Sequence, residues 1–396
     1  MERLLKFYIN GEWVVPQSTQ TMPMLNPATA EQVSEVALGN EADVDVAVAA
    51  AKAAFEQFSQ TSKSERLALL RRIRLVSERR FEELAQAMRL EMGAPITMAR
   101  EAQADAAIGH LDGFIQALEK LEEQERFDNG EVVLKEPIGV CGLITPWNWP
   151  INQVVLKVLP VIATGCTCVL KPSEHTPVSA MLYAEILDEA GVPAGVFNLV
   201  QGVGPLVGAA LSRHADIQMM SFTGSTRAGT AVTRDAADTV KRVTLELGGK
   251  SPNLVFADCD LQAQVTQSVA ECMFNTGQSC DAPTRLLVER ACYDEAVAIA
   301  RSAAEATAVG DPEQEGEHIG PLFDQIQFDR VQSMIQVGID EGATLVAGGP
   351  GRPEGFEKGW YVRPTIFADV NNSMRIAREE IFGPVLTVYV YEDHDF

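Results

Sequence analysis

The order of apolar and polar residues predicts strands at the start of the chain, followed by helices and a hairpin. FYINGEWV at 7–14 predicts a strand and a turn. Apolar residues then recur at helical spacing in three stretches, 44–58, 65–90 and about Thr97 to about Leu121. The segment 127–139 alternates as a hairpin or ribbon strand, with Asn129-Gly130 as its turn.

From residue 139 onward, short apolar runs that end in Gly or Pro alternate with helical stretches. The strand-like runs are 139–146, 167–172, 196–202, 217–224 and 243–249, and the helical stretches between them are 154–163, 179–190, 205–213 and 230–238. A second set begins near Ser251, with strand-like runs at 253–258, 284–290, 344–349 and 384–391. This order is typical of doubly wound, mostly parallel sheets, so the predicted fold class is α/β with two interlocked domains.

Length, composition and charge narrow the class of protein. A chain of 396 residues is long enough for two domains, and 46% hydrophobic with 22% charged residues is ordinary for a globular protein. A formal net charge of −23 argues against nucleic acid and anionic membranes as partners. The chain contains no apolar run of membrane-spanning length, and its start has no signal or transit pattern, so we expect a cytoplasmic protein.

The cysteine pattern predicts free thiols and no metal. Seven dispersed cysteines fit a reducing compartment better than a disulfide framework. Cys166 and Cys168 form a C-x-C, but within CTCVL they alternate like residues of a buried strand. The five histidines do not cluster with them, and we therefore expect no metal site.

The segment FNTGQSCDAPTR at 274–285 carries a candidate nucleophile, Cys280. This cysteine follows a Gly-Gln turn and precedes an apolar strand, which is a loop setting that can present a side chain to a cleft. A thiolate attacks carbonyl carbon well and leaves readily afterwards. The alternative is an inert loop cysteine.

Two further segments end strands with polar side chains. Glu246 in LELGGKSP lies at the carboxyl edge of the predicted sheet, where it can serve as a general base; the alternative is a solvated strand end. Asn148 in ITPWNWPIN is flanked by Trp and Pro residues and can donate to an oxyanion; the alternative is a turn-forming Asn.

Two more strand ends suggest a nucleotide site. In LKPSEHTP, Lys171 and Glu174 can contact ribose hydroxyls, while Ser173 or Thr176 can cap the following helix. In SFTGSTRAG, Gly224 permits close backbone approach, and Ser225 and Thr226 can cap a helix or contact phosphate at its N-terminus. GVGPLVG at 202–208 imitates a dinucleotide fingerprint, but its third Gly is one residue late, and it predicts a tight strand-to-helix turn.

In this order, the motifs resemble the aldehyde dehydrogenase superfamily from FYINGEWV to EEIFGPV at 379–385. The NTGQSC and LELGGKSP motifs are highly specific, and their Glu246 and Cys280 are 34 residues apart, as in that family. The resemblance implies that Cys280 attacks the aldehyde and that Asn148 and the Cys280 N–H hold the oxyanion. Hydride then passes to NAD, and Glu246 activates water to hydrolyse the thioester.

The same resemblance implies which residues bind the cofactor and the substrate. The expected cofactor contacts are Lys171, Ser173, Glu174, Gly224, Ser225, Glu380, Phe382 and Trp147. The expected tunnel residues are Trp149, Leu156, Phe274, Ser279 and Asp281. Glu174 favours NAD over NADP because a carboxylate repels a 2′-phosphate, and Glu246 favours release of a free acid over transfer to coenzyme A. Asp281 beside the nucleophile favours a neutral aliphatic or aromatic aldehyde.

The resemblance also implies the domain plan and the rival functions. We expect a Rossmann-like NAD-binding domain over 1–121 and 141–247, an oligomerisation β-ribbon over 122–140, and a catalytic domain over 248–396. Family members continue past the last strand, so we expect a C-terminally truncated chain whose full-length form is a homodimer or homotetramer. One rival is an inactive NAD-binding or structural protein on this scaffold. Another is a cofactor-independent cysteine hydrolase, although no His motif supports it.

Overall fold

The structure, a computed structural model, describes residues 2–392 and divides them into two compact units. The first unit comprises the described residues up to Met24, together with Gln32–Glu91 and Ala99–Leu247. The second comprises Leu25–Glu31, Met92–Met98 and the described residues from Gly248 onward. The last four residues of the predicted catalytic domain, 393–396, lie outside the described residues.

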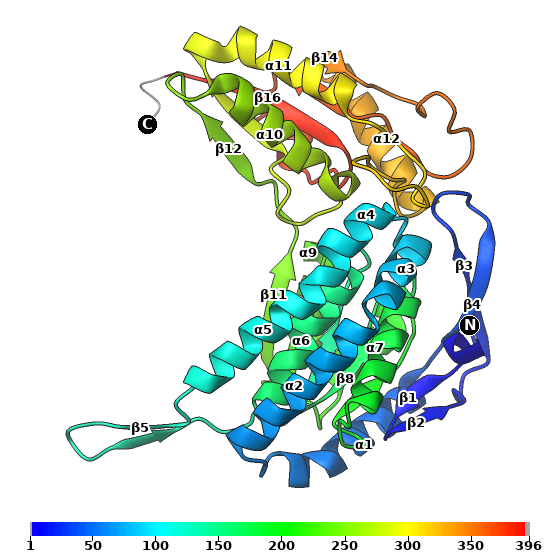
Figure 1. Ribbon diagram of the computed structural model, residues 1–396, viewed down its shortest axis with the longest axis vertical. Coiled ribbons are helices and arrows are strands. Elements are labelled where there is room, and N and C mark those ends of the chain that lie inside the picture. The colour runs from blue at the N-terminus through cyan, green and yellow to red at the C-terminus, as the bar shows by residue number, and fades with distance from the viewer. Residues whose placement is uncertain (1, 393–396) are drawn as a thin grey trace. The chain divides into compact units, whose positions relative to one another are not determined.

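The first unit is built on a seven-stranded sheet with the order β11-β10-β7-β8-β9-β1-β2 (Figure 1). Its strands are β1 (Phe7–Ile9), β2 (Glu12–Val14), β7 (Val140–Ile144), β8 (Thr167–Lys171), β9 (Phe197–Leu199), β10 (Met219–Gly224) and β11 (Arg242–Leu247). Strands β7 to β11 run parallel, whereas β1 pairs antiparallel with both β9 and β2. This arrangement confirms the predicted doubly wound sheet.

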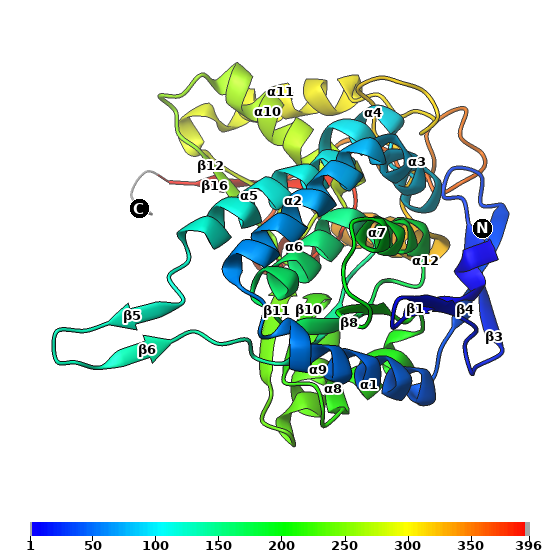
Figure 2. The same cartoon turned by 60° about the horizontal axis from the view of Figure 1, so that its bottom comes forward.

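Helices cover both faces of this sheet (Figure 2). They are α1 (Glu41–Phe58), α2 (Lys63–Arg79), α3 (Phe81–Met92), α5 (Asp105–Lys120), α6 (Pro150–Ala163), α7 (Pro177–Glu189), α8 (Ala209–Arg213) and α9 (Thr226–Ala237). Helices α6 and α7 pack on one face with α2 and α5 outside them, and α1, α8 and α9 lie on the other face. The short helix η1 (Glu2–Leu5) precedes β1, and the π-helices η2 (Ala99–Ala104) and η3 (Gly204–Gly208) lead into α5 and α8.

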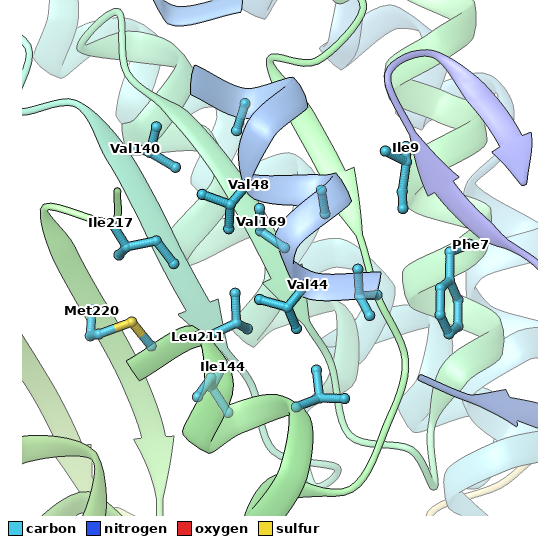
Figure 3. Packing of buried hydrophobic residues seen from close by; sticks show 14 of the residues in the cluster. Phe7, Ile9, Val44, Val48, Val140, Ile144, Val169, Leu211, Ile217 and Met220 are labelled. Carbon is cyan, nitrogen blue, oxygen red and sulfur yellow. The ribbon is translucent and has the colours of Figure 1, made fainter. Parts of the chain in front are cut away.

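Helix α1 shows how the sequence pattern produces the packing. A capping box starts the helix: Asn40 Oδ1 accepts from Asp43 N at 3.2 Å, and Asp43 Oδ2 accepts from Asn40 N at 3.0 Å. Val44 and Val48, which recur at helical spacing, are fully buried (Figure 3). They pack in one core with strand residues such as Val169. The apolar stripe therefore joins the helix to the sheet.

Several predicted elements are confirmed with changed boundaries. The helical pattern at 65–90 forms two helices, α2 and α3, which are separated at Arg80. The helix predicted from about Thr97 consists of α4 (Ile96–Met98), η2 and α5. The predicted ribbon is β5 (Gln124–Arg126) paired with β6 (Val132–Leu134), and it projects from the first unit (Figures 1 and 2). The two-stranded ribbon of β3 (Gln20–Leu25) and β4 (Gln32–Leu38) was not predicted.

The second unit is built on a five-stranded sheet with the order β12-β13-β16-β15-β14. Its elements are β12 (Pro252–Val255), α10 (Leu261–Met273), η4 (Phe274–Gly277), β13 (Arg285–Glu289), η5 (Arg290–Cys292), α11 (Tyr293–Ala306), α12 (Gln325–Asp340), β14 (Thr344–Ala347), β15 (Thr365–Ala368), α13 (Arg375–Arg378) and β16 (Val385–Tyr391). Leu386 and Val388 of β16 pack with residues of α10 and α11, whereas Val385 and Tyr389 pack with residues of α12. The sheet therefore carries a core on each face.

Candidate active site

The loop before Cys280 is held in a conformation that ordinary residues adopt rarely. Asn275, Thr276 and Gly277 have φ of 52°, 56° and 72°, three left-handed residues in succession. Gln278 is buried and spans the loop, because its Nε2 donates to Asn275 O at 3.1 Å and its Oε1 accepts from Phe323 N at 3.0 Å. The backbone that leads to the half-buried Cys280 is therefore fixed from both sides.

Glycines let three segments of the second unit meet at this loop. A Cβ on Gly277 would lie 2.1 Å from Gly383 O, and one on Gly248 would lie 2.1 Å from Glu380 Oε2. A Cβ on Gly249 would lie 3.4 Å from Cys280 O. Only glycine fits the first two positions without movement. The NTGQSC, GGK and EIFGP segments therefore converge within the second unit.

Helix α12 fixes the segment that contains Glu380 and Phe382. Gln327 Nε2 donates to Phe382 O at 2.7 Å, and Arg330 Nη2 donates to Glu380 O at 2.6 Å. Phe382 has a φ of 63°, which this clamp maintains. Glu380 Oε1 accepts from Gly249 N at 3.2 Å. Burial raises the pKa of Glu380, although this hydrogen bond and the neighbouring cations oppose the shift.

In the first unit, Lys171 and Glu174 form an ion pair at the carboxyl end of β8. Lys171 is 2% exposed, and its Nζ donates to Glu174 Oε2 at 2.8 Å and to Pro172 O at 2.7 Å. Burial favours the neutral carboxyl, but the charge of Lys171 and its hydrogen bond outweigh burial and lower the pKa of Glu174. The carboxylate is therefore ionised beside a buried ammonium.

The helix that follows this pair is capped by a residue far away in the sequence. The side chains of Ser173 and Thr176 make no cap to α7, which contradicts the alternative role predicted for them. Ser173 Oγ instead accepts from His175 N at 3.3 Å. The carboxylate of Glu91 takes the capping position, accepting from Val178 N at 2.5 Å and from Ser179 N at 3.2 Å. A buried acid on α3 thus satisfies the N-terminus of α7.

Strand β10 ends in a glycine and a helix cap. Gly224 has a φ of 158°, and Ser225 Oγ accepts from Ala228 N at 3.3 Å as the N-cap of α9. The first turn of α9 contains no acidic residue, so its positive end is not neutralised locally.

The residues after β7 are positioned by the start of α6. Trp149 precedes Pro150, the first residue of the helix, and Asn148 is 4% exposed. The Asn148 carbonyl accepts from Gln103 Nε2 at 3.2 Å, and Trp147 is half-buried. Asn148 is thus buried between β7 and α6, with its backbone carbonyl held by Gln103.

Glu246 is an exposed residue near the carboxyl end of β11, the edge strand of the first sheet. It is paired in register with Thr223 of β10. Burial lowers the pKa of Lys157 on α6 to about 8, and the Glu246 carboxylate opposes that shift. Lys157 Nζ also donates to Ser221 Oγ at 3.1 Å. The lysine is therefore a close electrostatic partner of Glu246 that the sequence pattern did not identify.

The predicted tunnel residues are divided between the units. Trp149 is half-buried and Leu156 is 37% exposed in the first unit. In the second unit Phe274 is 45% exposed, Ser279 is half-buried and Asp281 is exposed. Sequence analysis also missed Lys250, whose pKa is lowered to about 8 mainly by burial.

Two properties of residues 2–392 bear on the class of site. No group of three or more His, Cys, Asp or Glu side chains in this part of the chain is placed to hold a metal ion. Within the same range, every helix is too short or too polar to cross a bilayer.

The strand order places Asn148, Lys171, Glu174 and Gly224 where nucleotides bind in such folds. The chain leaves β7 for β8 and β9 on one side and returns to β10 and β11 on the other. Ligands of doubly wound sheets bind at this reversal, outside the carboxyl ends of the strands. Asn148, Lys171 with Glu174, and Gly224 all follow or end strands at or beside the reversal.

Comparison with known proteins identifies the family. A profile of the aldehyde dehydrogenase family matches residues 13–395. A 3-succinoylsemialdehyde-pyridine dehydrogenase of a Pseudomonas species is 50% identical over 391 residues, which are 98% of this chain and 82% of that protein. The chain therefore belongs to the aldehyde dehydrogenase family and is an oxidoreductase.

Solved structures agree in fold over the whole chain. A mutant aldehyde dehydrogenase of Pseudomonas syringae in complex with NAD+ and octanal is 51% identical, with a TM-score of 0.98, and the match covers 100% of this chain and 81% of that one. A betaine aldehyde dehydrogenase of Staphylococcus aureus in complex with NAD+ is 33% identical, with a TM-score of 0.95 over 100% of this chain and 80% of that one.

Proposed function

We propose that the chain oxidises a neutral aldehyde to a carboxylic acid and reduces NAD. The observation that carries this proposal is the buried Lys171–Glu174 pair beside the strand reversal of the first sheet, in a chain whose second unit fixes a cysteine loop. Aldehyde oxidation needs a nucleotide site and a nucleophile, and this chain has a candidate for each.

The residues of the first unit fit NAD by charge and position. An ionised Glu174 accepts hydrogen bonds from ribose hydroxyls and repels a 2′-phosphate, while Lys171 donates to the same sugar. The free positive end of α9, after Gly224 and Ser225, suits a pyrophosphate. Ser173 and Trp147 complete this side, and Glu380 with Phe382 bind the nicotinamide ribose and ring. When bound, NAD accepts the hydride.

The chemical steps are carried by three side chains. The Cys280 thiolate attacks the aldehyde carbon, and the Asn148 amide and the Cys280 N–H donate to the oxygen as it becomes negative. Loss of hydride converts the thiohemiacetal into a thioester. Glu246 takes a proton from water, which attacks the thioester carbon and releases the acid and the Cys280 thiolate.

The surroundings of Glu246 support the role of a base for water. Its carboxylate is exposed, so water reaches it, and it acts on the buried Lys157, whose lowered pKa it partly offsets. A water-accessible carboxylate near the end of a strand is what this step requires. Lys157 is therefore assigned to positioning and charge.

The residues on the substrate side favour an aldehyde without a charged group. Asp281 is exposed directly after the nucleophile and repels a nearby substrate carboxylate. Trp149, Leu156 and Phe274 offer apolar surface, and Ser279 leaves room beside the thiol. The relative crystallised with octanal supports a neutral aliphatic aldehyde, and octanal is the first substrate to test.

The ribbon of β5 and β6 supports a homo-oligomer. Val133 and Leu134 on the short strand β6 are 46% and 59% exposed, and every residue of both strands is exposed. Exposed apolar edges of this kind are covered in stable soluble proteins.

The test follows NADH absorbance in the purified chain with octanal. The wild type should produce NADH, Cys280→Ala should produce none, and Glu246→Gln should give a first burst with steady turnover slowed roughly a hundredfold. Cys292→Ala, which changes another half-buried cysteine, is the matched control and should retain activity.

Three results would contradict the proposal. Full steady turnover by Glu246→Gln would remove Glu246 as the base. NAD binding without any NADH from aldehydes would favour the inactive binding protein. Faster oxidation of a semialdehyde acid than of a neutral aldehyde of equal length would refute the substrate class.

A further inference from the structure

Three cysteines gather at the amino ends of β7 and β8, opposite to the strand ends that carry the candidate cofactor site. Cys141 on β7 is paired in register with Cys168 on β8, and Cys166 immediately precedes β8. All three side chains are buried, and all seven cysteines of the protein are thiols. The mechanism proposed above uses none of these three.

Cys141 and Cys166 are in direct contact, with Cys141 as the donor. The Cys141 thiol hydrogen-bonds to the Cys166 sulfur, which also accepts from the backbone N–H groups of Ile138 and Gly139. The Thr164 hydroxyl lies 3.4 Å from the same sulfur and shares its proton with Pro160 O at 2.7 Å. Several donors around one sulfur stabilise its thiolate.

These contacts shift the pKa values of the Cys166 and Cys141 thiols in opposite directions. The hydrogen bond from Cys141 is the main cause that lowers the pKa of Cys166 to about 6, and burial opposes it. The same contact is the main cause that raises the pKa of Cys141, whereas burial and then the charge of Cys166 raise the pKa of Cys168. The contacts therefore favour ionisation of Cys166 and oppose ionisation of Cys141.

A cavity of about 650 Å³ gives small molecules access to both sulfurs. Its lining includes Cys141 and Cys166 but not Cys168. Lys157 of α6, Arg242 of β11 and Glu136 line the same cavity. Arg66 of α2, which is paired with Glu123, lies beside Gly165.

We propose that Cys166 and Cys141 form a peroxide-reactive thiol pair, with Cys166 as the attacking and Cys141 as the resolving cysteine. The Cys166 thiolate attacks hydrogen peroxide, which gives a sulfenic acid and hydroxide. The Cys141 thiol then condenses with the sulfenic acid, forming a disulfide and releasing water. Two thiols lose two electrons and peroxide gains them, so the step is balanced.

The test oxidises the intact chain with sub-stoichiometric hydrogen peroxide, alkylates the remaining thiols and maps the peptides by mass spectrometry. The expected product is a Cys141–Cys166 linked peptide. Cys141→Ser should instead accumulate a Cys166 sulfenic acid that dimedone traps, and Cys168→Ser, the matched control, should form the link as the wild type does.

A second measurement needs no variant. Native alkylation of the wild type at about pH 7 should label Cys166 at least about tenfold faster than Cys168, because the contacts of Cys166 favour its thiolate and Cys166 lines a cavity that Cys168 does not. Equal slow labelling of both would overturn the proposal. A Cys166–Cys168 link, or peroxide damage that spares Cys166, would overturn it as well.

Discussion

Replacing Glu91 by glutamine removes a buried ionisable group without removing the helix cap that it makes. Glu91 is fully buried, and its carboxylate accepts from Val178 N and Ser179 N at the start of α7. Burial raises the pKa of Glu91 from its ordinary value of 4.5 to about 8, although these hydrogen bonds oppose the shift. A glutamine retains an acceptor oxygen and is neutral at every pH.

The sign and size of the effect follow from linkage. Because the folded-state pKa of Glu91 is raised, its stabilising contribution is complete below pH 4.5 and is lost as pH rises toward about 8. One pKa unit corresponds to about 1.4 kcal/mol, so the wild type should lose about that much unfolding free energy for each pH unit in this window. Glu91→Gln lacks the loss, and its advantage over the wild type should reach several kcal/mol by about pH 8.

Urea unfolding of both proteins at intervals from about pH 5 to about pH 8 measures the two slopes. Glu56→Gln is the matched control, since Glu56 is an exposed glutamate on α1, and it should keep the wild-type slope. Parallel slopes for Glu91→Gln and the wild type would refute the reasoning. They would show that the two N–H groups and the helix end keep Glu91 ionised despite its burial.

Two further substitutions test packing, one in each unit. Tyr183 is fully buried, and its hydroxyl has no hydrogen-bond partner among residues 2–392, so Tyr183→Phe should raise the unfolding free energy by about 1 kcal/mol; a loss measured by urea unfolding would contradict this. Gly277→Ala places a methyl group 2.1 Å from Gly383 O at a φ of 72° and should cost at least about 2 kcal/mol and most NADH production. Its control, Gly109→Ala on α5, meets nothing within 4 Å and should stabilise the helix by about 0.5–1 kcal/mol, so equal effects at the two sites would refute the steric argument.

The α/β alternation could be predicted because its signals are local. Strands such as 219–224 are short apolar runs that stop at glycine, and helices such as α1 carry a cap and an apolar stripe. The ribbon of β3 and β4 lacked such a signal. Its strands mix exposed, half-buried and buried residues without regular alternation, so no periodicity marked them.

Site residues that lie in motifs or at strand ends could be predicted from the sequence. Residues whose function depends on partners far away in the sequence could not. Cys280 and Lys171 were found from their segments. Gln278 was not, because its function as a clamp depends on Phe323, and Lys157 was not, because only folding brings it beside Glu246. Glu91 looks like one more acid on an amphipathic helix until its contact with α7 is known.

The Cys141 and Cys166 thiols show how strand pairing brings together reactive side chains that the local sequence pattern does not predict. The alternation of Cys166 and Cys168 predicted a buried strand, and both side chains are buried. Their contact with Cys141 arises because β7 and β8 pair with Cys141 opposite Cys168 and Ile144 opposite Lys171. One register thus sets both ends of the two strands, aligning the thiols at the amino end and the cofactor residues at the other. A slip by one residue would turn the side chains to the opposite face and separate both groups, so the same pairing maintains the candidate NAD site and the peroxide-reactive pair.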